Sequence, residues 1–183
     1  MDSIILIGGG GHCLASIDVI LSQNKYTILG IIDKNNDINK SISSFQYLGD
    51  DKSLPALVSK YKNALITIGQ IRSNYNRFKI FNLLKKLNAS LPIIISPRAY
   101  LAFETFIGEG TIIMHNALIN AGARIGNNCI INTKSLIEHE VKIGSHCHIS
   151  TSTTLNGGVK IGDGTFVGSN SVIYENIKIG KNC

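Results

Sequence analysis

The sequence has no tryptophan, and aromatic residues make up only 7% of it. Proteins that bind RNA or single-stranded DNA use stacking aromatic side chains and clustered arginines. The 18 basic residues outnumber the 12 acidic ones and give a net charge of +6, but the lysines are scattered among apolar residues and form no basic block. We therefore expect no nucleic-acid partner, and instead small acidic ligands that carry phosphate groups.

Long apolar runs are also missing. The runs that are present fall far short of the roughly 20 residues that a membrane-spanning helix needs. The start, Met1-Asp2-Ser3, has no basic residue, and Ile4 to Ile7 is too short for the apolar part of a secretory signal. We therefore predict no membrane association and a cytoplasmic location.

Cysteine is scarce, and no two cysteines have the spacing of a zinc site or a CxxC motif. The four cysteines are Cys13, Cys129, Cys147 and Cys183. A cytosolic compartment would keep them reduced, so we expect small buried apolar side chains at these positions and no bound metal.

The second half of the chain repeats every six residues. An aliphatic residue stands at each sixth position of an unbroken series: Ile107, Ile113, Ile119, Ile125, Ile131, Ile137, Ile143, Ile149, Leu155, Ile161, Val167, Ile173 and Ile179. Three residues after most of these comes a glycine or asparagine, the residue types that tolerate positive φ. A helix with 3.6 residues per turn does not produce this period. The pattern indicates short strands joined by tight corners.

The same half of the chain also has a second, longer sequence period. The pair Ile-Gly recurs every 18 residues, at Ile107, Ile125, Ile143, Ile161 and Ile179. Three six-residue units therefore make one coil, and stacked coils would place these isoleucines about 4.8 Å apart, the usual distance between paired strands. The repeat predicts a parallel β-helix with an aliphatic interior.

Residues 1–96 follow a different pattern, in which short apolar strands alternate with helices. The expected elements are a strand at Ile4–Ile7, a helix at Leu14–Leu21, a strand at Tyr26–Ile32, a helix at Leu54–Tyr61, a strand at Ala64–Ile68, a helix at Asn74–Leu87 and a strand at Leu91–Ile95. We therefore predict two domains: a Rossmann-like βαβ domain over residues 1–96, and an all-β parallel β-helix over residues 97–183.

A glycine-rich loop, Gly8 to Gly11, separates the first strand from the first helix. In a βαβ unit, the backbone N–H groups of such a loop and the helix N-terminus can face a diphosphate. The dinucleotide motif GxGxxG fails here, because Cys13 stands in place of its third glycine. Asp33 ends the second strand, where a carboxylate could accept a hydrogen bond from a ribose or a base. We predict a nucleotide site without nicotinamide chemistry.

One histidine in the coil is placed to act as a base. His139 lies two positions after an inward isoleucine, so its side chain falls outside the aliphatic interior. A neutral imidazole can accept a proton near neutral pH, and a neighbouring Glu138 or Glu140 could stabilise its charged form. His115, His146 and His148 also lie in the coil, and periodicity alone does not choose among the four.

Four segments of the coil, taken together with the glycine-rich start, resemble a known family. They are Ile131 to Thr133, Ser135 to Glu140, His146 to Ser150 and Gly157 to Gly162. The chain resembles the sugar O-/N-acyltransferases, which include sialic-acid O-acetyltransferases and bacillosamine-pathway N-acetyltransferases. This resemblance implies a left-handed β-helix made of hexapeptide repeats, acetyl-CoA as co-substrate, and a homotrimer.

The resemblance also assigns roles to residues. It implies His139 as the general base, Glu140 as its supporting carboxylate and Asn132 in the same site. It places Gly157 as a backbone N–H donor to the thioester oxygen, and His148 near the acetyl-CoA. The residues implied for the nucleotide sugar are Gly8, Gly10, Gly11, His12, Asp33, Lys34 and Gly69.

We therefore predict an acetyl-CoA-dependent N-acetyltransferase that acetylates the 4-amino group of a UDP- or dTDP-linked amino-dideoxy sugar by direct transfer. Two alternatives remain: an O-acetyltransferase of sialic-acid type, and an inactive β-helix that binds a sugar nucleotide. The resemblance implies further coils after this point, so a chain that ends at Cys183 is expected to be either truncated or naturally short.

Overall fold

The computed structural model describes residues 1–34, 42 and 44–183. The chain forms two compact units: residues 1–69 with 75–92, and residues 70–74 with 93–183. The short segment 70–74 therefore belongs with the second unit, whereas the sequence pattern placed all of residues 1–96 in one domain. Within the described residues, no helix has the length and apolar character needed to cross a membrane.

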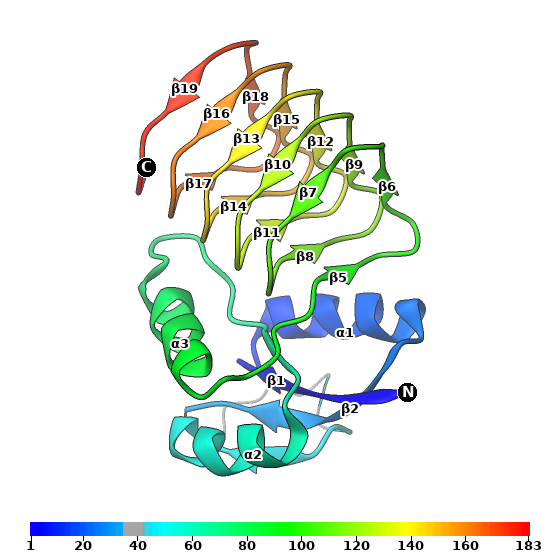
Figure 1. Ribbon diagram of the computed structural model, residues 1–183, viewed down its shortest axis with the longest axis vertical. Helices are drawn as coiled ribbons and strands as arrows, with labels where there is room; N and C mark the ends of the chain where they lie inside the picture. Colours follow the sequence, from blue (N-terminus) through cyan, green and yellow to red (C-terminus); the bar gives the residue numbers. More distant parts are fainter. Residues whose placement is uncertain (35–41, 43) are drawn as a thin grey trace. The chain divides into compact units, whose positions relative to one another are not determined.

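The first unit is a parallel four-stranded sheet with helices, drawn in blue to green in Figure 1. The strand order is β3-β2-β1-β4, and every pairing is parallel. Its elements are β1 (Asp2–Ile7), α1 (Gly11–Gln23), β2 (Tyr26–Ile32), β3 (Tyr47–Gly49), a 3-10 helix (Asp51–Ser53), α2 (Leu54–Tyr61), β4 (Ala64–Ile66) and α3 (Tyr75–Lys86). This confirms the predicted βαβ architecture.

The second unit is a β-helix of fifteen two-residue strands, which stack into three parallel sheets (Figure 1). The first sheet holds β5 (Ile94–Ile95), β8 (Ile112–Ile113), β11 (Ile130–Ile131), β14 (His148–Ile149) and β17 (Phe166–Val167). The second holds β6 (Tyr100–Leu101), β9 (Leu118–Ile119), β12 (Leu136–Ile137), β15 (Thr154–Leu155) and β18 (Val172–Ile173). The third holds β7 (Phe106–Ile107), β10 (Arg124–Ile125), β13 (Lys142–Ile143), β16 (Lys160–Ile161) and β19 (Lys178–Ile179).

Strand register confirms the 18-residue coil. Ile125 pairs with Ile107 on one side and with Ile143 on the other, and the other two sheets repeat the same offset. The coil begins earlier than the sequence pattern showed, because β5 and β6 pair with β8 and β9. Ile94 and Ile95, expected in the last strand of the first domain, therefore belong to the β-helix.

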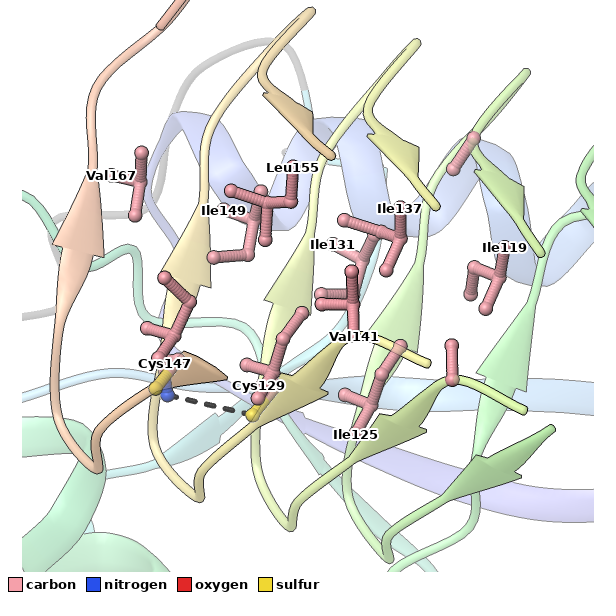
Figure 2. Close-up of a cluster of buried hydrophobic side chains, with 14 of the residues drawn as sticks. Ile119, Ile125, Cys129, Ile131, Ile137, Val141, Cys147, Ile149, Leu155 and Val167 are labelled. Carbon is pink, nitrogen blue, oxygen red and sulfur yellow. Dashed lines mark hydrogen bonds between the residues drawn. The ribbon is translucent and has the colours of Figure 1, made fainter. Parts of the chain in front are cut away.

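The interior of the β-helix is a continuous aliphatic column, shown in Figure 2. The inward residues of successive coils, such as Ile119, Ile137 and Leu155, are fully buried. Full burial of such a side chain contributes roughly 1.5–3 kcal/mol. Cys129 and Cys147 occupy neighbouring coils in this column, and the backbone N–H of Cys147 donates to Cys129 Sγ at 3.4 Å. These two cysteines and Cys13 are buried, as expected, whereas Cys183 is exposed, so the prediction of burial was wrong for Cys183.

The corners between strands place one residue per turn in the left-handed backbone region. Glycine and asparagine fill most of these positions, as the repeat predicted. Lys134 and Glu140 also adopt positive φ, each at 60°. A side chain other than Gly or Asn in this region costs roughly 1 kcal/mol. Glu104, His146 and Ser152 also adopt positive φ, and all five residues bear a conformational cost that the repeat itself does not require.

Candidate active site

The glycine-rich loop of the first unit is tied to the end of β2. The backbone N–H of Gly9 donates to Asp33 Oδ2 at 2.8 Å, and Thr67 Oγ1 donates to the carbonyl of Gly8 at 2.7 Å. Gly8 has φ +107°, and a Cβ there would lie 2.8 Å from the backbone N of Ile68. The loop is thus fixed closely against the carboxyl ends of β2 and β4.

After Gly9, no other described part of the protein packs against the side-chain positions of the loop. A Cβ at Gly10 or Gly11 would meet no atom within 4 Å, and α1 begins at Gly11. An anion can therefore approach the first backbone N–H groups of the helix without a side chain in the way. His12 and Gly69 lie beside this point, since a Cβ on Gly69 would be 3.6 Å from His12 Cβ.

A cavity of about 210 Å³ opens next to the loop, within the first unit. Gly8, Asp33 and Lys34 line it, as the predicted nucleotide site requires, and Asp51, Asn76 and Lys79 line it as well. The last three were not expected, because they come from the 3-10 helix and α3 rather than from a glycine motif. The cavity offers both carboxylates and amines to a polar ligand.

In the β-helix, His139 lies at the corner between the second and third sheets. We call this place the His139 corner. Its side chain is 61% exposed, and Nδ1 lies 3.4 Å from Glu140 Oε2. The ring covers the next coil at Gly157, where a Cβ would come within 2.7 Å of His139 Nε2. The backbone N–H of Gly158 donates to the carbonyl of His139 at 3.0 Å. The structure thus brings His139, Glu140 and Gly157 together.

Glu138, the other carboxylate next to His139, is held by a residue that the sequence did not single out. Asn120 Nδ2, one coil earlier, donates to Glu138 Oε2 at 2.9 Å. Asn120 occupies the same corner position as Glu138, 18 residues before it, so the coil period could have identified the pair. Glu140, rather than Glu138, is therefore the carboxylate that faces the imidazole.

Asn132 and His148 form a second cluster, away from the His139 corner. Asn132 Nδ2 lies 3.1 Å from His148 Nε2, and His148 Nδ1 contacts the carbonyl oxygen of Gln70. A carbonyl only accepts, so Nδ1 carries the proton and Nε2 accepts from Asn132. His148 is 6% exposed. Its predicted role beside acetyl-CoA stays a prediction, and the geometry shows a buried neutral imidazole.

The segment 70–74 is anchored to the β-helix by side-chain hydrogen bonds. Gln70 Nε2 donates to the carbonyl of His146 at 2.8 Å, and Asn74 Nδ2 donates to Asn182 Oδ1 at 3.1 Å. No sequence signal pointed to these hydrogen bonds, which join positions 76 and 108 residues apart.

Glu140 provides a first prediction, because its backbone conformation and its carboxylate can be tested separately. Glu140→Gly and Lys134→Gly should each raise stability by roughly 1 kcal/mol, since both remove a non-glycine residue from the left-handed region. Only Glu140→Gly should lower kcat, by about tenfold, because it removes the carboxylate beside His139. Chemical denaturation and steady-state rates measure the two effects. Equal rates in both variants would show that the carboxylate has no catalytic part.

Two family models match the chain. The PglD N-terminal domain matches residues 3–84, and the bacterial transferase hexapeptide (six repeats) matches residues 104–139 and 158–183. No curated protein matches the chain.

Solved structures resemble the chain along almost its whole length. The acetyltransferase domain of PglB from Neisseria gonorrhoeae FA1090 is 22% identical with a TM-score of 0.88, covering 99% of this chain and 86% of that one. The same domain in complex with acetyl coenzyme A is 23% identical with a TM-score of 0.87, covering 98% of this chain and 85% of that one. PerB from Caulobacter crescentus, in complex with CoA and GDP-perosamine, is 26% identical with a TM-score of 0.83, covering 97% and 91%. The PglB likeness shows the shared fold, which confirms the predicted left-handed β-helix.

Proposed function

The chain belongs to the PglD-type sugar N-acetyltransferases, and from this premise we propose that it acetylates the 4-amino group of a nucleotide-linked amino-dideoxy sugar. It is an acetyl-CoA-dependent enzyme. The observation that carries the proposal is the His139 corner. An exposed imidazole lies against Gly157, with a carboxylate 3.4 Å from its other ring nitrogen.

His139 acts as the general base in this proposal. The sugar amine attacks the thioester carbon, a C–N bond forms, and the C–S bond to the thiol breaks. The nitrogen loses one proton, which His139 accepts and the departing sulfur finally takes up. Glu140 stabilises the imidazolium formed in between, since opposite charges within about 4 Å favour the protonated ring. The products are an amide and a free thiol, and no acyl-enzyme forms.

The residues around His139 fit a thioester. The missing side chain at Gly157 leaves room for the imidazole of His139 to lie directly against the next coil. Negative charge develops on the thioester oxygen during attack, and a backbone N–H is a suitable donor to it. Gly157 is proposed to supply this N–H group. Asn132 and His148, which form the second cluster, remain proposed site residues.

The glycine-rich loop and the 210 Å³ cavity are the proposed nucleotide site of the first unit. The N-terminus of α1 faces the diphosphate, and Asp33 fixes the loop through Gly9 while Lys34 provides positive charge. UDP and dTDP are the proposed carriers. GDP is a third carrier to be tested, because PerB is bound to GDP-perosamine.

We also propose that the enzyme is a homotrimer. A single chain holds His139 on one corner and Asn132 on another, so a neighbouring copy is one way to bring both clusters to one site. The second sheet offers an apolar surface for such contact, since Tyr100 and Val172 are 61% and 68% exposed. Light scattering should give three times the mass of one chain, and a monomer would contradict the proposal.

Thiol release from acetyl-CoA tests the function. The acceptors are 4-amino sugars linked to UDP, dTDP or GDP, the corresponding 4-hydroxy sugars, and free sialic acid. We expect release with at least one amino sugar and none with its hydroxy counterpart. Release with sialic acid alone would indicate an O-acetyltransferase, and no release with any acceptor would contradict the proposal.

A further inference from the structure

Helix α3 carries a charged residue on its buried face. The buried residues of this helix are Arg77, Ile80, Phe81 and Leu84, which have the spacing of one helical stripe. Arg77 is only 1% exposed, although arginine is almost never fully buried unless its N–H groups have partners. The arginine at this position therefore calls for a hydrogen-bonding explanation rather than a packing one.

The acceptors of Arg77 lie at the carboxyl end of β4. Its Nη1 donates to the carbonyl of Ile66 at 2.7 Å and to the carbonyl of Ile68 at 2.8 Å. Between them, the N–H of Thr67 donates to the carbonyl of Ile7 in β1 at 2.8 Å. Because successive residues of a strand direct their backbone groups to opposite sides, the two isoleucine carbonyls face away from β1. β4 is the last strand in the order of its sheet, so Arg77 supplies donors at a sheet edge.

The same end of β4 supports the glycine-rich loop. Thr67 Oγ1 donates to the carbonyl of Gly8 at 2.7 Å. A Cβ on Gly8 would lie 2.6 Å from Ile68 Cγ1 and 2.8 Å from the backbone N of Ile68, so the loop backbone packs directly against this residue. A displacement of Ile68 would therefore displace the loop whose N–H groups are proposed to face the diphosphate.

Helix α3 also contributes to the proposed nucleotide site. Asn76 and Lys79 line the 210 Å³ cavity together with Gly8 and Ile68. Arg77 is not among the lining residues, and its side chain is buried behind them. Its guanidinium thus joins two parts of the lining, the loop and the end of β4 on the one hand and the first turns of α3 on the other.

We propose that Arg77 is a positioning residue of the nucleotide site, which holds α3 against the end of β4 and so keeps the cavity in the shape that a nucleoside diphosphate requires. This inference rests on the proposed function. Arginine suits the role because Nη1 alone has two N–H groups, one for each carbonyl, in a planar fork. Lysine places a point charge on a flexible stem, and methionine has no donor at all. Neither residue reproduces the pair of hydrogen bonds.

The test measures nucleotide binding and CoA binding on the same full chain. Arg77→Met removes both hydrogen bonds, and Arg77→Lys takes its place if circular dichroism shows that the methionine variant does not fold. Leu84→Ala is the matched control, because Leu84 is fully buried on the same face of α3 and its side chain has no hydrogen-bonding group. Its truncation destabilises the fold without removing a bond to β4. Isothermal titration calorimetry with UDP, dTDP, GDP and CoA gives the dissociation constants, and chemical denaturation gives the stabilities.

We expect Arg77→Met to weaken binding of the preferred nucleoside diphosphate by about 30- to 100-fold, Arg77→Lys by about 3- to 10-fold, and CoA binding by less than about twofold in either variant. Leu84→Ala should be destabilised but bind both ligands within about twofold of the unmodified chain. In steady-state assays, Arg77→Met should raise KM for the nucleotide sugar and leave KM for acetyl-CoA unchanged. A parallel loss of both ligands, or the same loss of nucleotide affinity in Leu84→Ala, would reduce Arg77 to a purely structural residue and overturn the proposal.

Acetyl transfer separates this inference from the proposed function. If Arg77→Met binds nucleoside diphosphates as tightly as the unmodified chain, the positioning role is wrong, although the enzyme still transfers acetyl groups. If Arg77→Met selectively loses nucleotide affinity but the unmodified chain acetylates no amino sugar, the positioning role stands and the proposed function fails. An unmodified chain that binds none of the three nucleoside diphosphates would overturn both.

Discussion

Replacing His139 by asparagine is expected to lower kcat for acetyl transfer by about 10²- to 10⁴-fold, the usual contribution of a general base. Asparagine is close in size to histidine but does not accept a proton from the attacking amine. The side chain is 61% exposed and makes no core contact, so stability should change by less than about 0.5 kcal/mol. Dissociation constants for CoA and the nucleotide sugar should stay within about twofold.

His146→Asn is the matched control for this variant. His146 lies on another corner of the same β-helix with φ +60°, a conformation that asparagine adopts readily. It should keep nearly full kcat. A His139→Asn enzyme with normal kcat would remove His139 from the mechanism, and an equal loss in both variants would point to a structural effect of either change.

Gly157→Ala is expected to lower kcat/KM by roughly 100-fold. The added Cβ would lie 2.6 Å from His139 Cε1 and 2.7 Å from Nε2, so the imidazole must move away from its present position. A shift of about 1 Å in a catalytic group can cost about 10² in rate. The backbone N–H at position 157 is retained in this variant. The loss would therefore report the position of the ring rather than the removal of a hydrogen-bond donor.

Gly168→Ala provides the comparison, because a Cβ there meets only ordinary contacts at 3.9 Å from Phe166 and Ser171. Steady-state rates and thermal unfolding should show a normal enzyme. The Gly157→Ala enzyme should unfold at nearly the same temperature as the unmodified one, since an exposed ring can rotate. Full activity in Gly157→Ala would show that contact with Gly157 does not fix the imidazole.

The β-helix could be predicted from sequence because its strand pairings repeat at a fixed offset. Ile125 pairs with the residues 18 positions before and after it, and the pattern is visible without any tertiary information. The start of the β-helix was harder to see. Ile95 continues the aliphatic series, but Pro97 and Arg98 interrupt the glycine and asparagine pattern of the corners.

The His139 corner follows the same logic, since His139, Glu140 and Gly157 are brought together by neighbouring positions on adjacent coils. The second cluster, Asn132 and His148, cannot be derived from the coil repeat in this way. His148 stands at an outward position of β14, where the repeat predicts exposure, yet the carbonyl of Gln70 contacts its ring from 78 residues away. No local pattern identifies the segment that covers a strand at such a distance, so the burial of His148 could not be predicted from the sequence.

Direct detection of the acetylated product tests the central claim most closely. The purified chain is incubated with acetyl-CoA and the amino sugar that gives the fastest thiol release, and nuclear magnetic resonance follows the sugar. We predict a new amide at the 4-position that forms at the rate of thiol release and is almost absent with His139→Asn. Thiol release without amide formation, or equal amide formation by the variant, would contradict the account.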